Sequence, residues 1–208
     1  FQAEDGIRDF CLSRGLGDVY KRQDQELLGK LLIASPGLED VRFQNSVILV
    51  CEHTNEVTMG LILNKPLYNF DTSQFLKKMK INNDLKIKSN PTFFGGPVHL
   101  NQGFIIHSNE KKYPTSEYIL EGVMITSSEE ILQDISKNQP PENAKIFLGC
   151  AVWDKGQLNN EVLENSWIIT NSSKELIFHN DLAISLWKDS LNKMGIDPKK
   201  LVSYSGRA

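Results

Sequence analysis

The sequence has little cysteine, no long apolar run and no large excess of one charge. Its three cysteines, Cys11, Cys51 and Cys150, are an odd number at wide spacing, which argues against a disulfide framework and fits a reducing compartment. The longest apolar runs, such as residues 46–51, are far shorter than the roughly 20 residues that span a bilayer. The net charge of −3 gives no overall attraction to nucleic acid. We therefore expect a folded cytoplasmic protein that does not enter membranes.

The sequence also lacks the motifs of common ligand sites. It has no P-loop, and residues 15–17 are not a dinucleotide fingerprint, because Tyr20 stands in place of the third glycine. The available zinc ligands have none of the usual spacings; they are Cys51, His53, His107 and Cys150. No helix-turn-helix, zinc finger or basic zipper is present. We predict no cofactor and no metal, and we do not expect direct binding of DNA.

Residues 1–23 differ from the rest of the chain. They show no sustained periodicity, carry four basic and four acidic residues, and contain no apolar segment. They resemble a translated sequencing adapter, so they are expected either not to belong to the native protein or to form a disordered arm. We expect residues 24–208 to form a single domain.

The remaining chain is predicted to be rich in strands. Seven short runs combine β-branched and aromatic residues and are bounded by Gly, Pro or Asn; they are residues 31–34, 46–51, 60–63, 92–94, 104–107, 123–126 and 145–148. Helical patterns are found at residues 71–79, at 127–135, from 158 onward and at 183–194. Ser127 and Glu130 have capping-box spacing, Trp187 is the expected anchor of the last helix, and Gly195 its left-handed C-cap. The irregular alternation of these strands and helices along the chain predicts an α+β fold with a mixed sheet.

Three stretches resemble the YqgE/AlgH family of bacterial proteins. They are NSVILVCEHTNEVTMGLILNKP (45–66), TFFGGPVHLNQGFIIHS (92–108) and KIFLGCAVWDKGQLNNEVLENSWI (145–168). The resemblance implies a bifurcated mixed β-sheet folded into a flattened pseudo-barrel, with helices packed outside and a smaller α/β lobe. The family is described as a candidate transcriptional regulator of exopolysaccharide synthesis, without a settled biochemical activity. This chain departs from its pattern at Cys150 and Val152, where the family has tyrosine and glycine.

Polar residues at strand ends and bends are the candidates for a ligand or partner surface. We expect them to meet at one exposed groove; they are Glu52, His53, Asn64, Pro66, Gly95, Gly96, Pro97, His107, Trp153, Gly156 and Gln157. Structural roles compete with this interpretation: Gly95 and Gly96 also fit a tight turn or bulge, and Trp153 also fits the core. Cys51 is interpreted as a small core residue.

Three functions follow from these residues. The leading hypothesis is a non-enzymatic regulatory or protein-interaction module with a protein partner and an indirect effect on transcription, because no catalytic constellation has its members close in sequence. The alternative is a small-molecule-binding protein or an enzyme, with Glu52, His53 and His107 as acid–base groups. A weaker alternative is nucleic-acid binding through Lys77, Lys78 and Lys80, which also fit a solvated helix face.

Overall fold

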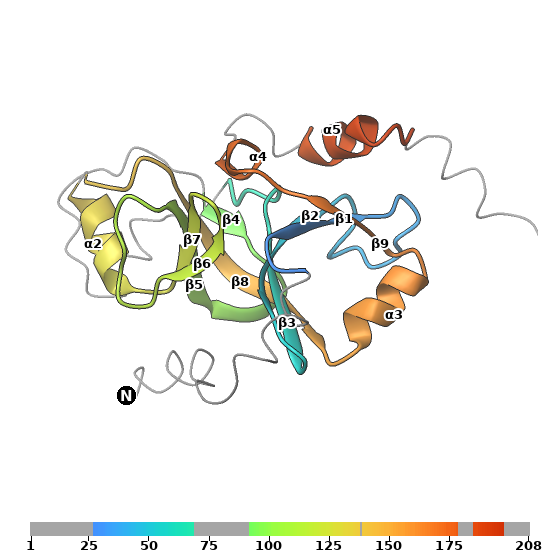
Figure 1. The fold of residues 1–208 in the computed structure, drawn as a ribbon, viewed down its shortest axis with the longest axis horizontal. Coiled ribbons are helices and arrows are strands. Elements are labelled where there is room, and N and C mark those ends of the chain that lie inside the picture. Colours follow the sequence, from blue (N-terminus) through green and yellow to red (C-terminus); the bar gives the residue numbers. More distant parts are fainter. Residues whose placement is uncertain (1–26, 69–91, 138, 179–184, 198–208) are drawn as a thin grey trace, which may run out of the picture.

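The computed structural model describes residues 27–68, 92–137, 139–178 and 185–197, and one curled β-sheet dominates it (Figure 1). The strands are β1 (Lys30–Ala34), β2 (Val47–His53), β3 (Val57–Ile62), β4 (Thr92–Phe94), β5 (Val98–Ser108), β6 (Glu117–Leu120), β7 (Val123–Thr126), β8 (Ala144–Asp154) and β9 (Trp167–Asn171). The helices are α2 (Glu129–Ser136), α3 (Gln157–Leu163), α4 (Lys174–Phe178) and α5 (Leu186–Lys193). The sheet order is β6-β7-β5-β8-β3-β2-β1-β9, with β4 joined to β8 beside this path.

Strand β8 is the point at which the sheet divides. On one side it pairs with antiparallel β5. Its other side is shared, because β4 pairs in parallel with residues 146–148 and β3 pairs in antiparallel fashion with residues 151–154. The parallel β4–β8 pair makes the sheet mixed, and the shared edge makes it bifurcated. Both features of the predicted fold are therefore confirmed.

Two adjacent glycines, Gly95 and Gly96, make this junction possible. The Gly95 N–H donates to the Leu148 carbonyl (2.8 Å), and the Gly95 carbonyl accepts from the Ile62 N–H (2.9 Å), so the segment after β4 connects β8 to β3. A Cβ on Gly95 would lie 2.2 Å from the Gly149 carbonyl oxygen, and a Cβ on Gly96 would lie equally close, 2.2 Å, to the backbone of β8. No side chain fits at either position. The structural interpretation of Gly95 and Gly96, as a tight turn or bulge, is therefore the one observed.

The inner face of the curl holds the largest apolar cluster, to which both halves of the sheet contribute. Leu31, Leu49, Ile106 and Phe147 are fully buried there. Helices α4 and α5 lie along one rim of the curl (Figure 1) and add buried side chains to the same cluster, including Trp187. The indole N–H of Trp187 donates to the Ala34 carbonyl (2.7 Å), which confirms Trp187 as the anchor of the last helix.

The outer face carries two separate clusters. One lies on β1, β2 and β3 beneath α3 and includes Leu32, Ile48 and Leu158. The other lies on β5 and β8 beneath α2 and includes Ile105 and Ile146. Helices α2 and α3 therefore pack outside the sheet, as expected, whereas α4 and α5 cover the inner cluster. The observed architecture is an α+β half-barrel, which agrees with the predicted α+β class and curled sheet.

Most predicted elements are present, and the differences are local. All seven predicted strands are found, whereas β6, β9 and α4 were not anticipated. The N-cap of α2 is Ser128, whose side chain accepts from the Glu130 N–H, and not Ser127 as predicted. Gly195 has a left-handed φ of 72° and follows α5, as the sequence indicates. The predicted helix at 71–79 lies outside the described residues.

Candidate functional site

The predicted surface residues that do meet lie where the β2–β3 turn contacts the end of β8. We call residues 53–58 together with residues 153–157 the hairpin end. Val57 pairs with Asp154 and Thr58 with Trp153. An ion pair between Lys155 Nζ and Glu56 Oε1 (2.9 Å) joins the two segments at the surface.

The β2–β3 turn is held by its own polar side chains. The Thr54 N–H donates to the Val57 carbonyl (2.9 Å), and the Thr54 hydroxyl accepts from the Val57 N–H (3.1 Å). His53, which is half-buried, places Nδ1 2.7 Å from the Thr58 hydroxyl across the hairpin. These contacts fix the imidazole ring before any ligand or partner arrives.

Gln157 holds the start of α3 against the end of β8. Its side-chain oxygen accepts from the Asp154 N–H (3.1 Å), and its amide nitrogen donates to Glu161 Oε1 (2.8 Å). Gly156 precedes it with a left-handed φ of 74°, which glycine adopts without strain. The turn between strand and helix is therefore held by hydrogen bonds on both sides of Gln157, and its polar groups at Gly156 and Gln157 are exposed.

Beneath this surface, one carboxylate organises an aromatic cluster. Glu161 Oε2 accepts from the indole N–H groups of Trp153 (2.9 Å) and Trp167 (2.6 Å). The two indole rings meet edge to face at 5.8 Å, and Phe43 contacts both. Trp153 is 3% exposed, so its alternative role in the core is the one observed. The sequence analysis did not identify Glu161; its position four residues after Gln157, on the same helical face, was the available signal.

Two predicted residues lie at the opposite end of β3. Asn64 is buried, and its amide accepts from the Val47 N–H (2.8 Å) and donates to the Asn45 carbonyl (2.7 Å). Pro66 forms a bridge to Phe93 in β4. The structure does not bring these residues to the hairpin end. Gly95 and Gly96 are buried at the junction, and the half-buried Pro97 follows them.

His107 is also separated from the hairpin end, because it lies inside the part of the sheet that pairs with β7. It is fully buried, with Nδ1 2.8 Å from the Ser108 carbonyl and Nε2 3.1 Å from the Ser116 hydroxyl. The Tyr113 ring meets it edge to face at 5.3 Å. Burial lowers the pKa of His107 against the weaker opposing effects of the Ser108 carbonyl and Glu110. His107 therefore has a structural setting, and the acid–base group expected from Glu52, His53 and His107 is not assembled.

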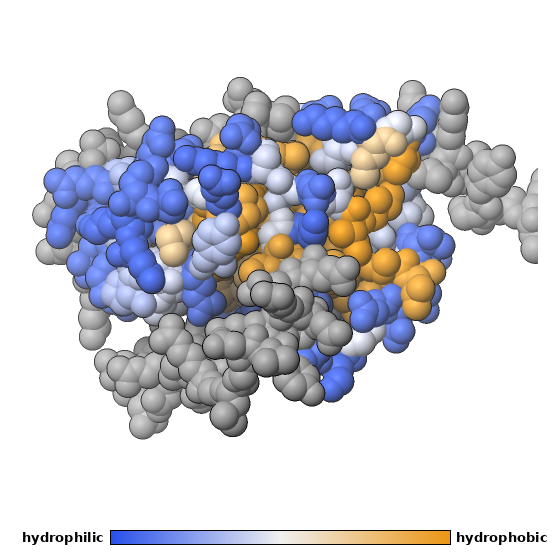
Figure 2. Space-filling view, in the orientation of Figure 1, coloured by the Kyte–Doolittle hydropathy of each residue, from blue (hydrophilic) through white to orange (hydrophobic). Residues whose placement is uncertain are grey.

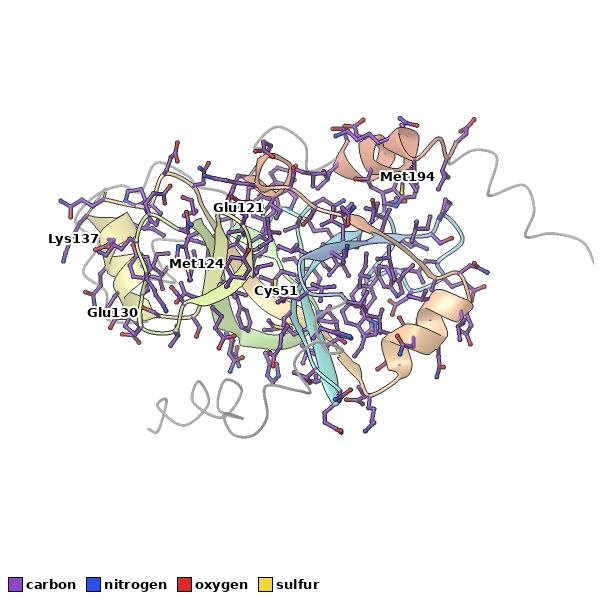
Figure 3. The ribbon with its side chains drawn as sticks, viewed as in Figure 1. Cys51, Glu121, Met124, Glu130, Lys137 and Met194 are labelled. Atoms are coloured by element: carbon purple, nitrogen blue, oxygen red, sulfur yellow. The ribbon has the colours of Figure 1, made fainter. Side chains whose placement is uncertain are left out.

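The reactive groups near the end of β2 are shielded. Cys51 lies among the side chains inside the curl (Figure 3), where burial raises the pKa of its thiol. Burial also raises the pKa of Cys150 to about 12. Burial and the neighbouring charge of Glu117 raise the pKa of the half-buried Glu52. Both thiols are protonated at neutral pH, so neither is an activated nucleophile.

Metal sites and membrane-spanning helices are not found in the part of the chain that the structure describes. No three side chains of His, Cys, Asp or Glu there are grouped to hold a metal ion. None of the helices among these residues has the length and apolar character needed to cross a bilayer. The lysines proposed for nucleic-acid binding, Lys77, Lys78 and Lys80, lie outside the described residues.

Two surface cavities lie away from the hairpin end. One, of about 410 Å³, lies between α4 and α5, with Leu176, Leu186 and Ser190 in its wall. The other, of about 640 Å³, lies between the β6–β7 turn and the start of α4, beside Gly122 and Lys174. None of the predicted surface residues lines either cavity.

Comparison with known proteins gives consistent matches along the chain. The profile of a family described as AlgH-like matches residues 31–199. A UPF0301 protein of Serratia proteamaculans is 38% identical over 181 residues, which cover 85% of this chain and 96% of that protein. A UPF0301 protein of Xanthomonas campestris is 36% identical over 183 residues, with 88% and 96% covered.

Solved structures share the same architecture. The solution structure of the AlgH protein from Pseudomonas aeruginosa has a TM-score of 0.71 and 25% sequence identity, and the match covers 94% of this chain and 100% of that chain. The crystal structure of a protein from Corynebacterium diphtheriae has a TM-score of 0.63 at 18% identity, with 94% and 95% covered. The second likeness concerns the fold alone.

Proposed function

Because the chain belongs to the AlgH-like family of bacterial proteins, we propose that it is a regulatory protein-interaction module whose hairpin end binds a protein partner. The observation that carries this proposal is the network of hydrogen bonds that holds the hairpin end. Its exposed polar groups rest on Gln157, Glu161 and the aromatic cluster, each held by hydrogen bonds or ring contacts. A surface that is already ordered loses little conformational entropy on binding, which favours recognition.

The character of the exposed groups also favours a protein partner. The surface offers a carboxylate at Glu56, an ammonium group at Lys155 and the amide of Gln157, all exposed. Polar groups that stay accessible to solvent are typical of the rim of a protein interface. The surface has no excess of positive charge that would attract a nucleic-acid backbone.

The buried state of the reactive side chains supports recognition over catalysis. The Cys51 and Cys150 thiols are buried with raised pKa, and both ring nitrogens of His107 have partners inside the core. An acid, base or nucleophile must reach its substrate within hydrogen-bond distance. We therefore propose that any effect on transcription is indirect and passes through the bound partner.

Site-specific photo-crosslinking tests this proposal. A photoreactive amino acid replaces Lys155 at the hairpin end, and the same amino acid replaces the exposed Lys188 on α5 as a matched control. After irradiation in living bacteria, we expect a discrete crosslinked protein from position 155 that is absent from position 188, identified by mass spectrometry. The same products from both positions, or none from position 155, would contradict the proposal.

The alternative function is a small-molecule-binding protein or an enzyme, and the cavity of about 640 Å³ beside α4 is the observation that favours it. A thermal-shift screen with nucleotides and metabolites separates the two functions. A ligand at 100 times its dissociation constant stabilises the protein by about 2.7 kcal/mol. A hit whose effect disappears in a Lys174→Ala variant, but persists when Lys155 is replaced, would favour this alternative.

A further inference from the structure

Strand β9 forms one edge of the sheet in the part of the chain that the structure describes. Among these residues it ends the strand order and pairs with β1 alone. The Ser35 N–H donates to the Ser166 carbonyl (2.9 Å). In an antiparallel ladder every second residue of a strand bonds toward the same neighbour, so this bond shows which residues of β9 face β1. Ile168 and Thr170 therefore bond toward β1, whereas the N–H and C=O groups of Trp167, Ile169 and Asn171 point outward. Among the described residues, no hydrogen bond reaches these outward backbone groups.

Apolar side chains flank this edge on both faces of the sheet. Figure 2 shows them gathered around β9, between α5 and α3. Ile169 is 38% exposed, and Leu163, at the end of α3, is 79% exposed. On the other face, Ile168 and Met194, the residue that follows α5, are each only partly buried against the inner cluster. An uncovered backbone edge with apolar flanks is a template for a further strand.

The opposite edge of the sheet is protected in ways that β9 is not. Strand β6 carries Glu117, is followed by Glu121, and has a register shift between Tyr118 and Leu120. Charges and irregularities of this kind prevent strand addition. Strand β9 has an unbroken register with β1 and contains no charged residue or proline. The difference indicates that the β9 edge is available for pairing.

We propose that β9 is a dimerisation edge and that its occupant is β9 of a second copy of this chain, in antiparallel pairing about Ile169. In this register Ile169 faces its own counterpart, and Trp167 faces Asn171, so every outward backbone group of the three residues has a partner. On the other face, Ile168 lies opposite Thr170. A two-fold axis requires such self-complementarity, which a strand without charged side chains provides.

The charges beside β9 favour the same pairing. Glu164 precedes the strand, and Lys174 follows it. Antiparallel pairing brings the Glu164 end of one copy to the Lys174 end of the other. Lys174 Nζ, which lies 3.9 Å from Glu142 Oε2 of its own copy, then gains a second carboxylate on each side of the axis. A parallel arrangement would bring like charges together. The proposed dimer uses residues other than those of the hairpin end, so it goes beyond the proposed function and can fail independently of it.

Sedimentation velocity of the full chain tests the dimer. Because strand-to-strand contacts of this length are small and weak, the measurement covers about 1 μM to about 500 μM. We expect a shift from monomer to dimer in the parent protein. Ile169→Lys is expected to remain monomeric throughout this range. Tyr118→Lys, which also introduces a lysine in an edge strand but at the β6 edge, is expected to dimerise like the parent. A parent protein that stays monomeric at all concentrations would overturn the proposal.

Two further measurements distinguish a loss of dimerisation from a loss of folding. Ile169→Pro removes one outward N–H and leaves the bonds from Ile168 and Thr170 to β1 intact, so a folded monomer is expected. Hydrogen exchange of the parent gives a second readout: protection of the Trp167, Ile169 and Asn171 amides should rise with protein concentration, while Ile168 and Thr170 stay protected throughout. Dimerisation without this alternation would place the interface elsewhere and overturn the assignment.

Discussion

The two halves of the sheet bury their polar groups in different ways. The first half comprises β1, β2, β3 and β9 with α3, and it satisfies indole N–H groups with Glu161 and a backbone N–H with Asn64. The second half comprises β5, β6, β7 and the first part of β8 with α2, and it buries His107 and Lys145. The Lys145 ammonium lies 5.3 Å from the centroid of the Phe93 ring, and burial lowers its pKa to about 8.

This contrast separates the buried His107 and Lys145 from the proposed binding surface. In the second half these two titratable groups act as parts of the core. The hairpin end, which includes the half-buried His53, belongs to the first half and the end of β8, where its polar groups are held by neighbours. The first half is therefore suited to binding, and His107 and Lys145 make the stability of the second half respond to pH.

The largest effect is expected at the glycine junction that joins the halves. Gly96→Ala would place a Cβ 2.2 Å from the backbone of β8, which must then move apart from the segment after β4. We expect a loss of about 4 kcal/mol or more in the free energy of unfolding, or failure to fold. Urea denaturation measures this loss. Gly37→Ala is the control, because nothing lies within 4 Å of its Cβ position; a loss at Gly96 no greater than at Gly37 would refute the proposed role of the junction.

The next largest effect is expected from Glu161, in the first half. Glu161→Ala leaves the indole N–H groups of Trp153 and Trp167 without their acceptor, at a cost of about 2 to 3 kcal/mol. Glu161→Gln retains one oxygen acceptor and should lose less. Tryptophan fluorescence during urea unfolding reports both changes. Glu164→Ala, at an exposed position just after α3, should change stability little, and an equal loss there would show that the aromatic cluster does not depend on Glu161.

An intermediate effect, confined to the second half, is expected from His107 as pH falls. The pKa of His107 is lowered in the folded protein, whereas the unfolded imidazole keeps its ordinary value of about 6.5. The unfolded state therefore binds the proton first, and stability that is complete above the unfolded pKa is lost as pH falls toward the folded pKa. His107→Gln should flatten the dependence of the urea midpoint on pH between about 7.5 and 5. An unchanged slope would show that other groups cause the pH response.

The smallest effect on stability is expected from His53 at the hairpin end. His53→Ala removes the contact with the Thr58 hydroxyl, at a cost of about 1 kcal/mol. The same variant, carrying the photoreactive residue at position 155, should capture less partner although it remains folded. A large loss of stability with unchanged capture would instead place His53 among the structural residues.

Local patterns predicted the elements well, and long-range contacts explain what they missed. Short runs of β-branched and aromatic residues identified seven strands, most of which bury a continuous run. Strand β9 (Trp167–Asn171) instead has a half-exposed pattern and resembled the end of the preceding helix. The cap of α2 was misplaced by one residue because Ser127 and Ser128 are adjacent and either could serve.

The candidate site was predictable only where its contacts are local. The turn that joins His53 to Thr58 and the one that joins Asp154 to Gln157 lie within single hairpins or caps. By contrast, Asn64 looked like a surface turn residue because its partner, the Val47 N–H, lies in a different strand. His107 looked like a catalytic group because the sequence does not show that it is buried. Its burial depends on Ser116 and Tyr113, which only the folded sheet places around it.

Strand β8 also determines when this protein can fold. Its partners β3, β4 and β5 all precede it in the chain. During synthesis β4, and the side of β5 that does not pair with β7, must therefore wait for residues 144–154 to leave the ribosome. The β1–β9 ladder closes later still. Such distant pairings make folding slow, and the emerging chain has unpaired strands that chaperones can bind. Ribosome-bound chains should therefore become protease-resistant only after β8 has emerged.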